Sequence, residues 1–207
     1  LADMCRLSIQ KGLLPHSNPG ILEKYELEKL RTCNASMGLM LETTGIVKAH
    51  TGCMGKTPAV RLKTIREAGE LNIPFTTGIL VGIGEKPSDR VRSLHEIRDL
   101  HIEFGHIQEV IIQNFIPKPG TNMSASRGPG MNTMKETVAL ARSILPDDVA
   151  VQVSPNLISP RELIECGAND LGGISPETID HINPEAPWPS IEELRAATRI
   201  PLRERLP

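Results

Sequence analysis

The feature that most constrains the fold of this chain is a repeated alternation of short apolar runs with stretches of helical periodicity. Five strand-then-helix units follow one another from residue 35 onward, and a sixth is indicated before them. The strand signals are GLLPHSNPG (12–20), ASMGLMLE (35–42), FTTGILVG (75–82), EVIIQNF (109–115), VAVQVS (149–154) and NDLGGIS (169–175). Because a helix carries the chain back after each strand, such units predict a parallel sheet.

Apolar residues that recur at roughly helical spacing mark the helices expected between these strands. The three clearest sets are Val60, Ile65, Ala68 and Leu71; Val91, Leu94, Ile97, Leu100 and Phe104; and Met134, Val138, Ala141 and Leu145. Residues 22–33 complete the first unit. A short helix is predicted in PRELIECG, between Pro160 and Gly167. The last helix begins with a capping box, in which Ser190 is followed by Glu193 three residues later.

Two architectures fit repeated strand–helix units: an open doubly wound sheet and an eight-unit barrel. Polar or glycine residues follow nearly every strand, and a barrel would join them around one mouth. These clusters are Glu42-Thr43, Gly82/Gly84/Glu85, Gln113-Asn114, Ser154/Asn156 and Asn169-Asp170. An open arc of six units would have raw parallel edges, and a complete barrel takes about 250 residues. We therefore expect one α/β domain over residues 1–207, a partial TIM-type (β/α) barrel whose missing units lie on the N-terminal side.

Charge and cysteine usage exclude several classes of function. The chain has 23 Lys and Arg against 25 Asp and Glu, and this balance, without a basic stripe, predicts no nucleic-acid partner. No apolar run is long enough to cross a bilayer. The four cysteines Cys5, Cys33, Cys53 and Cys166 form no CxxC pair, so we expect reduced, buried thiols in a cytoplasmic protein.

The stretch TTGILVGIGE (76–85) ends a strand with glycines but does not predict a phosphate site. A dinucleotide fingerprint needs a third glycine three residues after Gly84, and that position is Pro87. The Gly-Lys-Ser/Thr ending of a P-loop is also absent. Glycines at a strand end let the backbone approach a planar ligand closely, so a ligand without phosphate is the better interpretation.

Five motifs in a fixed order carry a resemblance to a known family. They are LMLET, GILVGIGE, NFIPKPGT, VSPNL and GANDLGGISPETIDHINPEAPWPSI. Together they resemble the C-terminal two-thirds of radical S-adenosylmethionine (SAM) enzymes, and more narrowly the 7,8-didemethyl-8-hydroxy-5-deazariboflavin (FO) synthase family. The resemblance extends from LLPHSNPG to PWPSIEEL, and its last motif is the longest and most specific.

This resemblance implies two groups of binding residues and no identified catalytic acid or base. The implied SAM contacts are Glu42, Gly78, Gly82, Gly84, Glu85, Pro117 and Gly120. The implied substrate contacts are Asn114, Asn156, Asn169 and Asp170, whose side chains suit a uracil edge or ribityl hydroxyls. Each also has a plainer interpretation, as an exposed strand end, a turn or a helix cap. His16 and the pair His50 and Cys53 are interpreted as ordinary loop residues rather than metal ligands.

The sequence departs from the family pattern in one respect. Radical SAM chemistry uses a [4Fe-4S] cluster on three cysteines spaced CxxxCxxC, and this triplet is absent from residues 1–207. The resemblance places the triplet near the first barrel strand. We therefore expect an N-terminally truncated fragment whose cluster ligands belong to the complete enzyme, and which alone would be inactive.

The implied reaction is that of a radical SAM carbon–nitrogen lyase. It would close 5-amino-5-(4-hydroxybenzyl)-6-(D-ribitylimino)-5,6-dihydrouracil to the deazaflavin chromophore FO with loss of ammonia. The implied partner is a companion radical SAM 4-hydroxybenzyl transferase that makes this adduct. The alternatives are the transferase reaction itself, a menaquinone-pathway relative, and a non-catalytic barrel remnant that binds adenosine compounds. An NAD-linked α/β enzyme is disfavoured by the missing third glycine.

Overall fold

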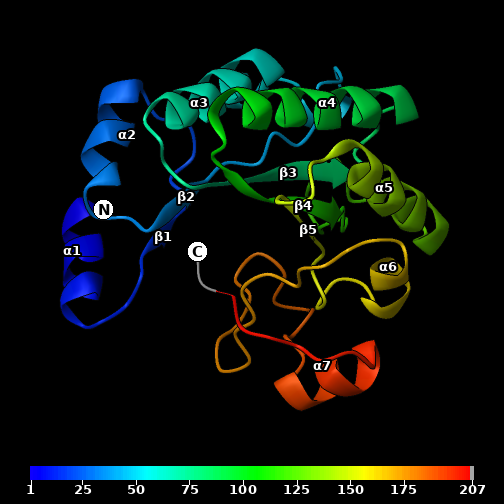
Figure 1. Cartoon of the computed structure of the whole chain (residues 1–207). Coiled ribbons are helices and arrows are strands. Elements are labelled where there is room, and N and C mark those ends of the chain that lie inside the picture. The colour runs from blue at the N-terminus through cyan, green and yellow to red at the C-terminus, as the bar shows by residue number, and fades with distance from the viewer. Residues whose placement is uncertain (206–207) are drawn as a thin grey trace.

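A computed structural model describes residues 1–205 of the chain, in which helices and strands alternate from α1 to α6 and a last helix, α7, follows α6 (Figure 1). The strands are β1 (His16–Ser17), β2 (Ser36–Gly38), β3 (Phe75–Val81), β4 (Ile107–Asn114) and β5 (Ala150–Gln152). The α-helices are α1 (Ala2–Gln10), α2 (Lys24–Arg31), α3 (Pro58–Glu70), α4 (Pro87–Phe104), α5 (Met131–Ile144), α6 (Arg161–Glu165) and α7 (Ile191–Thr198). Two 3₁₀ turns, η1 (Lys48–His50) and η2 (Met54–Lys56), lie between β2 and α3.

The five strands form one parallel sheet in the order β1-β2-β3-β4-β5, so neighbours in sequence are neighbours in space. The longest pairing joins β3 to β4, from Phe75 opposite Ile107 to Val81 opposite Asn114. Helices α2 to α5 follow the outside of this arc, and the segment after α6 lies on its other side (Figure 1). The expected parallel arc of (β/α) barrel units is confirmed.

Two single bridges extend the sheet beyond its named strands. Glu42 pairs with Ile79, which continues the β2 segment to the end predicted from the sequence. Asp170 pairs with Gln152 and gives a sixth parallel position. The strand predicted over residues 169–175 is otherwise wrong. The Asp170 side chain accepts a hydrogen bond from the Gly172 amide at 2.6 Å, and Gly172 has a φ of +72°, so the chain turns away from the sheet.

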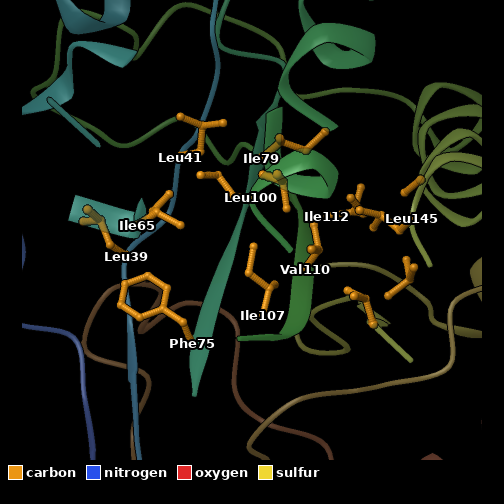
Figure 2. Close-up of a cluster of buried hydrophobic side chains, with 14 of the residues drawn as sticks. Leu39, Leu41, Ile65, Phe75, Ile79, Leu100, Ile107, Val110, Ile112 and Leu145 are labelled. Atoms are coloured by element: carbon orange, nitrogen blue, oxygen red, sulfur yellow. The ribbon is translucent and has the colours of Figure 1, made fainter. Parts of the chain in front are cut away.

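The core lies between the sheet and the outer helices (Figure 2). Phe75 and Ile79 of β3 and Val110 and Ile112 of β4 are at most 1% exposed and pack toward Ile65 of α3. Strand residues alternate between faces, so Thr76 and Glu109, which are register partners, lie on the concave face of the arc. This register pair therefore places two polar side chains on the concave face, opposite the apolar side chains that pack toward α3.

Local sequence explains where the helices begin and end. Pro58 and Pro87 occupy first-turn positions of α3 and α4, where a missing amide hydrogen leaves no bond unmade. Gly105 ends α4 in the left-handed conformation, with a φ of +64°. The predicted capping box of α7 is confirmed, with the Glu193 amide 3.2 Å from Ser190 Oγ and the Ser190 amide 2.7 Å from the Glu193 carboxylate.

The expectation that all four cysteines are buried is confirmed for only two of them. Cys5 and Cys33 are buried, but Cys53 is exposed and Cys166 is half-buried. Cys53 lies in the short loop between the turns η1 and η2, and residues 51–55 of this loop are all exposed. Within residues 1–205, none of the helices combines the length and apolarity needed to cross a bilayer.

Candidate SAM and substrate site

The C-terminal ends of the strands meet along one edge of the sheet, and Glu42 lies there with three basic side chains around it. Its carboxylate is 2.8 Å from His50 Nε2, 3.2 Å from Arg61 Nη1, and bonded to Lys56 Nζ. The Glu42 and Arg61 side chains are each 9% exposed. Three bases around one carboxylate leave an excess of positive charge, which is suited to an incoming carboxylate.

The same cluster is tied to the backbone, so its geometry is fixed before any ligand binds. Arg61 Nε donates to the Gly55 carbonyl at 3.0 Å, and its Nη1 donates to the Met40 carbonyl. Burial lowers the pKa of the Arg61 guanidinium, while the neighbouring Glu42 carboxylate raises it. Arg61 thereby joins helix α3 to the chain just before Glu42 and holds both charges at the mouth.

Glu42 has an unusual backbone conformation for a residue with a side chain. Its φ is +66°, although its amide and carbonyl still bond to Gly78 and Leu80 of β3 at 2.9 Å each. A left-handed non-glycine residue costs free energy and is found most often at functional sites. The strained backbone turns the Glu42 carboxylate toward the basic side chains of the following loop.

A second part of the site is the turn after β3. Gly82 and Gly84 each have a φ of +99°, a conformation that favours glycine. A Cβ on Gly82 would lie 2.6 Å from Pro129 Cδ, whereas a Cβ on Gly84 would meet no atom within 4 Å. Gly82 is therefore required by packing, and Gly84 has an open face that a planar group could cover.

Glu85 is turned into this loop rather than toward the mouth. Its carboxylate accepts hydrogen bonds from the Gly82 amide at 3.0 and 3.1 Å and from the Ile83 amide at 2.8 Å. Arg90 pairs with it at 2.7 Å, and the Glu85 side chain is only 2% exposed. Through these contacts Glu85 fixes the conformation of the loop from its buried side.

The remaining predicted SAM contacts differ in their surroundings. Gly78 lies in the middle of β3, and a Cβ there would be 2.3 Å from the Ile111 carbonyl oxygen, so close strand packing requires glycine. Pro117 and Gly120 lie in the loop after β4, where Gly120 is exposed with a φ of +75° and open space around it. This loop begins one residue past β4 and borders the same edge as Gly84.

Two of the predicted substrate contacts, Asn114 and Asn156, lie at this edge as expected. Asn114 ends β4, is 6% exposed, and donates from Nδ2 to the Leu157 carbonyl at 3.3 Å. Asn156 follows β5 and donates from Nδ2 to Asp180 and to the Ala186 carbonyl. Among the residues that the structure describes, neither amide oxygen has a partner.

The other two predicted substrate contacts have protein partners on the concave face. Asn169 Oδ1 accepts a hydrogen bond from the Val151 amide at 2.8 Å and so completes the ladder beside β5. Asp170 pairs with Arg205 Nε at 2.7 Å, and Arg205 also binds Glu109 of β4. Arg205 thus brings the C-terminal segment against the inner face of the arc. Substrate contacts by Asn169 and Asp170 remain predictions.

Sequence reasoning missed the basic partners of Glu42. The sequence favours an ordinary loop role for His50 and carries no signal that marks Lys56 or Arg61. Their sequence distances from Glu42 follow no local period, so the spacing carries no signal. Among residues 1–205, His, Cys, Asp and Glu side chains form no group of three that could hold a metal ion.

Comparisons with known proteins identify close relatives. No protein-family model matches the chain. The 7,8-didemethyl-8-hydroxy-5-deazariboflavin synthase of Methanococcoides burtonii is 62% identical over 208 residues, which cover 100% of this chain and 63% of that protein. The synthase of Archaeoglobus fulgidus is 51% identical over 210 residues, covering 100% of this chain and 65% of that protein. The chain therefore spans less than two thirds of the length of these relatives.

Solved structures agree in fold at low sequence identity. Methylornithine synthase (PylB) superposes with a TM-score of 0.75 at 18% identity, over 96% of this chain and 60% of PylB. The hydrogenase maturase HydG from Carboxydothermus hydrogenoformans gives 0.62 at 20% identity, over 81% and 43%. The parallel arc is thus a fold shared with these proteins. Through its sequence along its whole length, this chain belongs to the 7,8-didemethyl-8-hydroxy-5-deazariboflavin synthase family.

Proposed function

We propose that this chain supplies the SAM-binding wall and much of the substrate wall of a radical SAM lyase that forms the deazaflavin chromophore FO. The substrate is the 4-hydroxybenzyl adduct of a ribitylimino-dihydrouracil, and the products are the closed ring and ammonia. A companion radical SAM 4-hydroxybenzyl transferase would provide the adduct. The names of the relatives favour this reaction over the transferase and menaquinone-pathway alternatives.

The observation that carries the proposal is that the cation-rich cluster at Glu42 and the open turn at Gly84 both lie toward the C-terminal ends of neighbouring strands. SAM has an α-carboxylate, an ammonium group, ribose hydroxyls and a flat adenine. Arg61 and Lys56 suit the α-carboxylate, and the Glu42 carboxylate suits the ammonium group or the ribose hydroxyls. The exposed backbone of Gly84 suits a face of the adenine. The residues present therefore fit SAM.

When reduced by a one-electron donor of the complete enzyme, bound SAM would supply the 5′-deoxyadenosyl radical that abstracts hydrogen from the adduct. Within residues 1–205, no described set of side chains fits a [4Fe-4S] cluster, so we derive no step from one. The chain's own part is to fix the methionine end of SAM at Glu42 and Arg61, to hold the adenine over Gly84, and to keep the reacting centre away from water.

The test is SAM affinity, measured by equilibrium dialysis with the 207-residue chain. We expect the Glu42→Gln and Arg61→Met variants to bind SAM about tenfold more weakly, because each removes one charge-assisted contact. Glu28→Gln, at an exposed position of α2, serves as the matched control and should keep the wild-type affinity. In the complete enzyme, Glu42→Ala should weaken SAM binding while the cluster stays intact. Unchanged SAM affinity in the Glu42 variants would contradict the assignment.

A further inference from the structure

Two buried amide oxygens at the mouth lack hydrogen-bond partners, and they belong to neighbouring strand ends. Asn114 Oδ1 and Asn156 Oδ1 have no partner among the described residues. Asn114 donates to the carbonyl of Leu157, which is the residue after Asn156, so the two amides occupy one small region. Buried polar atoms are almost always paired in folded proteins, so two adjacent exceptions point to a missing partner.

The contacts of the amide nitrogens determine which atom of each side chain is free. Asn156 Nδ2 donates to Asp180 Oδ2 at 3.0 Å and to the Ala186 carbonyl at 3.2 Å. A flipped Asn156 would place its oxygen against these two acceptors. A flipped Asn114 would likewise oppose the Leu157 carbonyl. Both side chains therefore present an acceptor, and the missing partner must be a donor.

Asp180 fixes the orientation of Asn156. Its Oδ1 accepts from the backbone amides of Ile182 and Asn183 at 2.9 and 3.1 Å, and its Oδ2 accepts from Asn156 Nδ2 and Asn183 Nδ2 at 3.0 Å each. Burial raises the pKa of Asp180, but these hydrogen bonds outweigh it and leave that pKa below its ordinary value. At neutral pH Asp180 is an acceptor only, so Asn156 has to turn its nitrogen toward it.

A second tie holds the segment that carries Asp180 against the β4 loop. Lys118 Nζ donates to Asn183 Oδ1 at 2.8 Å and pairs with Glu185. We call residues 178–186 the strap. Lys118 and Asn156 are thus two points at which hydrogen bonds attach the strap to the loops after β4 and β5.

We propose that Asn114 and Asn156 are paired acceptors for N–H and O–H donors of the substrate, and that Asp180 is the positioning residue that sets Asn156. This inference rests on the proposed function, because a ribityl-substituted uracil ring offers one imide N–H and several hydroxyls. Asn156, held by two hydrogen bonds, suits the rigid imide N–H. Asn114, held by a single bond of 3.3 Å, suits a hydroxyl of the flexible ribityl chain.

The experiment compares two fluorescent probes, the deazaflavin FO and its analogue methylated at the imide nitrogen, in titrations of the 207-residue chain. The methylated probe should bind wild type about tenfold more weakly, which corresponds to one hydrogen bond to a buried acceptor. Asn156→Leu should abolish the difference between the probes. Asp180→Asn should also reduce the ratio of the two dissociation constants, to a value between that of wild type and one, because the Ala186 carbonyl alone then favours the present orientation of Asn156.

The ratio separates positioning from a general structural role. If Asp180 only supported the fold, Asp180→Asn would weaken both probes equally and leave the ratio unchanged. Asp147→Asn, at a fully exposed position, is the matched control. Tight binding of both probes to wild type, with a ratio near one, would overturn the inference and leave the proposed function standing. Failure of the unmethylated probe to bind would overturn both, whereas loss of SAM binding alone would affect only the proposed function.

Discussion

The Glu85 carboxylate and the Arg90 guanidinium form a pair at 2.7 Å in which the side chains are only 2% and 15% exposed. They are five positions apart in the sequence, and the pair joins the glycine turn to the first turns of helix α4. Because Glu85 also accepts hydrogen bonds from the Gly82 and Ile83 amides, one carboxylate determines the shape of the loop at the mouth. The Glu85–Arg90 pair therefore connects the stability of helix α4 to the shape of the glycine turn.

Replacing Glu85 with Gln should destabilise the protein by about 3 kcal/mol, because it leaves a buried guanidinium without its counter-charge. The free energy of unfolding, measured by urea denaturation at neutral pH, checks this value. Glu103→Gln is the matched control, since Glu103 pairs with Arg66 at 2.7 Å but both side chains are about half exposed. The control should lose less than about 1 kcal/mol. Equal losses in the two variants would contradict a buried role for Glu85.

The two glycines of the turn should respond differently to alanine. Both have a φ of +99°, so each substitution strains the backbone by about 1–3 kcal/mol. Gly82→Ala adds a clash with Pro129 and should lower the melting temperature further than Gly84→Ala does. Gly84→Ala should instead weaken SAM binding, because its new methyl group occupies the open face. Thermal unfolding and equilibrium dialysis measure the two effects separately. Similar stability in both variants would show that the Pro129 contact is unimportant.

His106 should make the fold sensitive to mild acid. It is 5% exposed, lies 3.0 Å from the Ile65 carbonyl and packs edge-on against Phe104. Burial lowers the pKa of His106 from 6.5 to about 4, while the hydrogen bond to Ile65 opposes this shift. The unfolded chain therefore binds the proton more readily. The stability that neutral His106 contributes is complete above pH 6.5 and is lost as the pH falls toward 4. The free energy of unfolding should decrease by about 3 kcal/mol over that pH range.

Urea denaturation at pH 7.5 and at pH 5 tests this prediction about His106. His106→Phe should flatten the pH dependence even if it changes stability at pH 7.5. His181→Gln, at an exposed position of the strap, should leave the pH dependence unchanged. A His106→Phe variant that keeps the wild-type loss between pH 7.5 and 5 would assign the acid sensitivity to another group.

Arg205 should hold the C-terminal segment against the concave face. It pairs with Asp170 and Glu109, whose side chains are 10% and 14% exposed, while its own is 44% exposed. Arg205→Met should lower the free energy of unfolding by about 1 kcal/mol, after allowance for solvent screening of the exposed guanidinium. Glu109→Gln should partly offset this loss in the double variant, because it removes one unpaired carboxylate. Arg203→Met, at an exposed position, is the control. Strict additivity of the Arg205 and Glu109 changes would exclude direct coupling.

Local patterns were sufficient to predict most of the fold. The helical spacing of Leu94, Ile97 and Leu100 predicted α4, and these residues are at most 3% exposed. The capping box at Ser190 and Glu193 marked the start of α7. Each of these signals is read within one or two turns of chain, so no knowledge of distant partners is needed. The prediction of the last strand was wrong because a tight turn, in which the Asp170 side chain accepts from the Gly172 amide, ends the strand after one bridge.

The site depended more on tertiary structure than on any local pattern. The sequence by itself placed Glu42, Gly84 and Asn114 at strand ends, because parallel strands bring their C-terminal ends to one edge. It could not show that Arg61, from the next helix, pairs with Glu42, or that Asp180 turns Asn156. Such pairings join residues far apart in the chain. They arise only when packing of the core sets the positions of the elements, so the strand order came from the sequence and the chemistry of the mouth came from the fold.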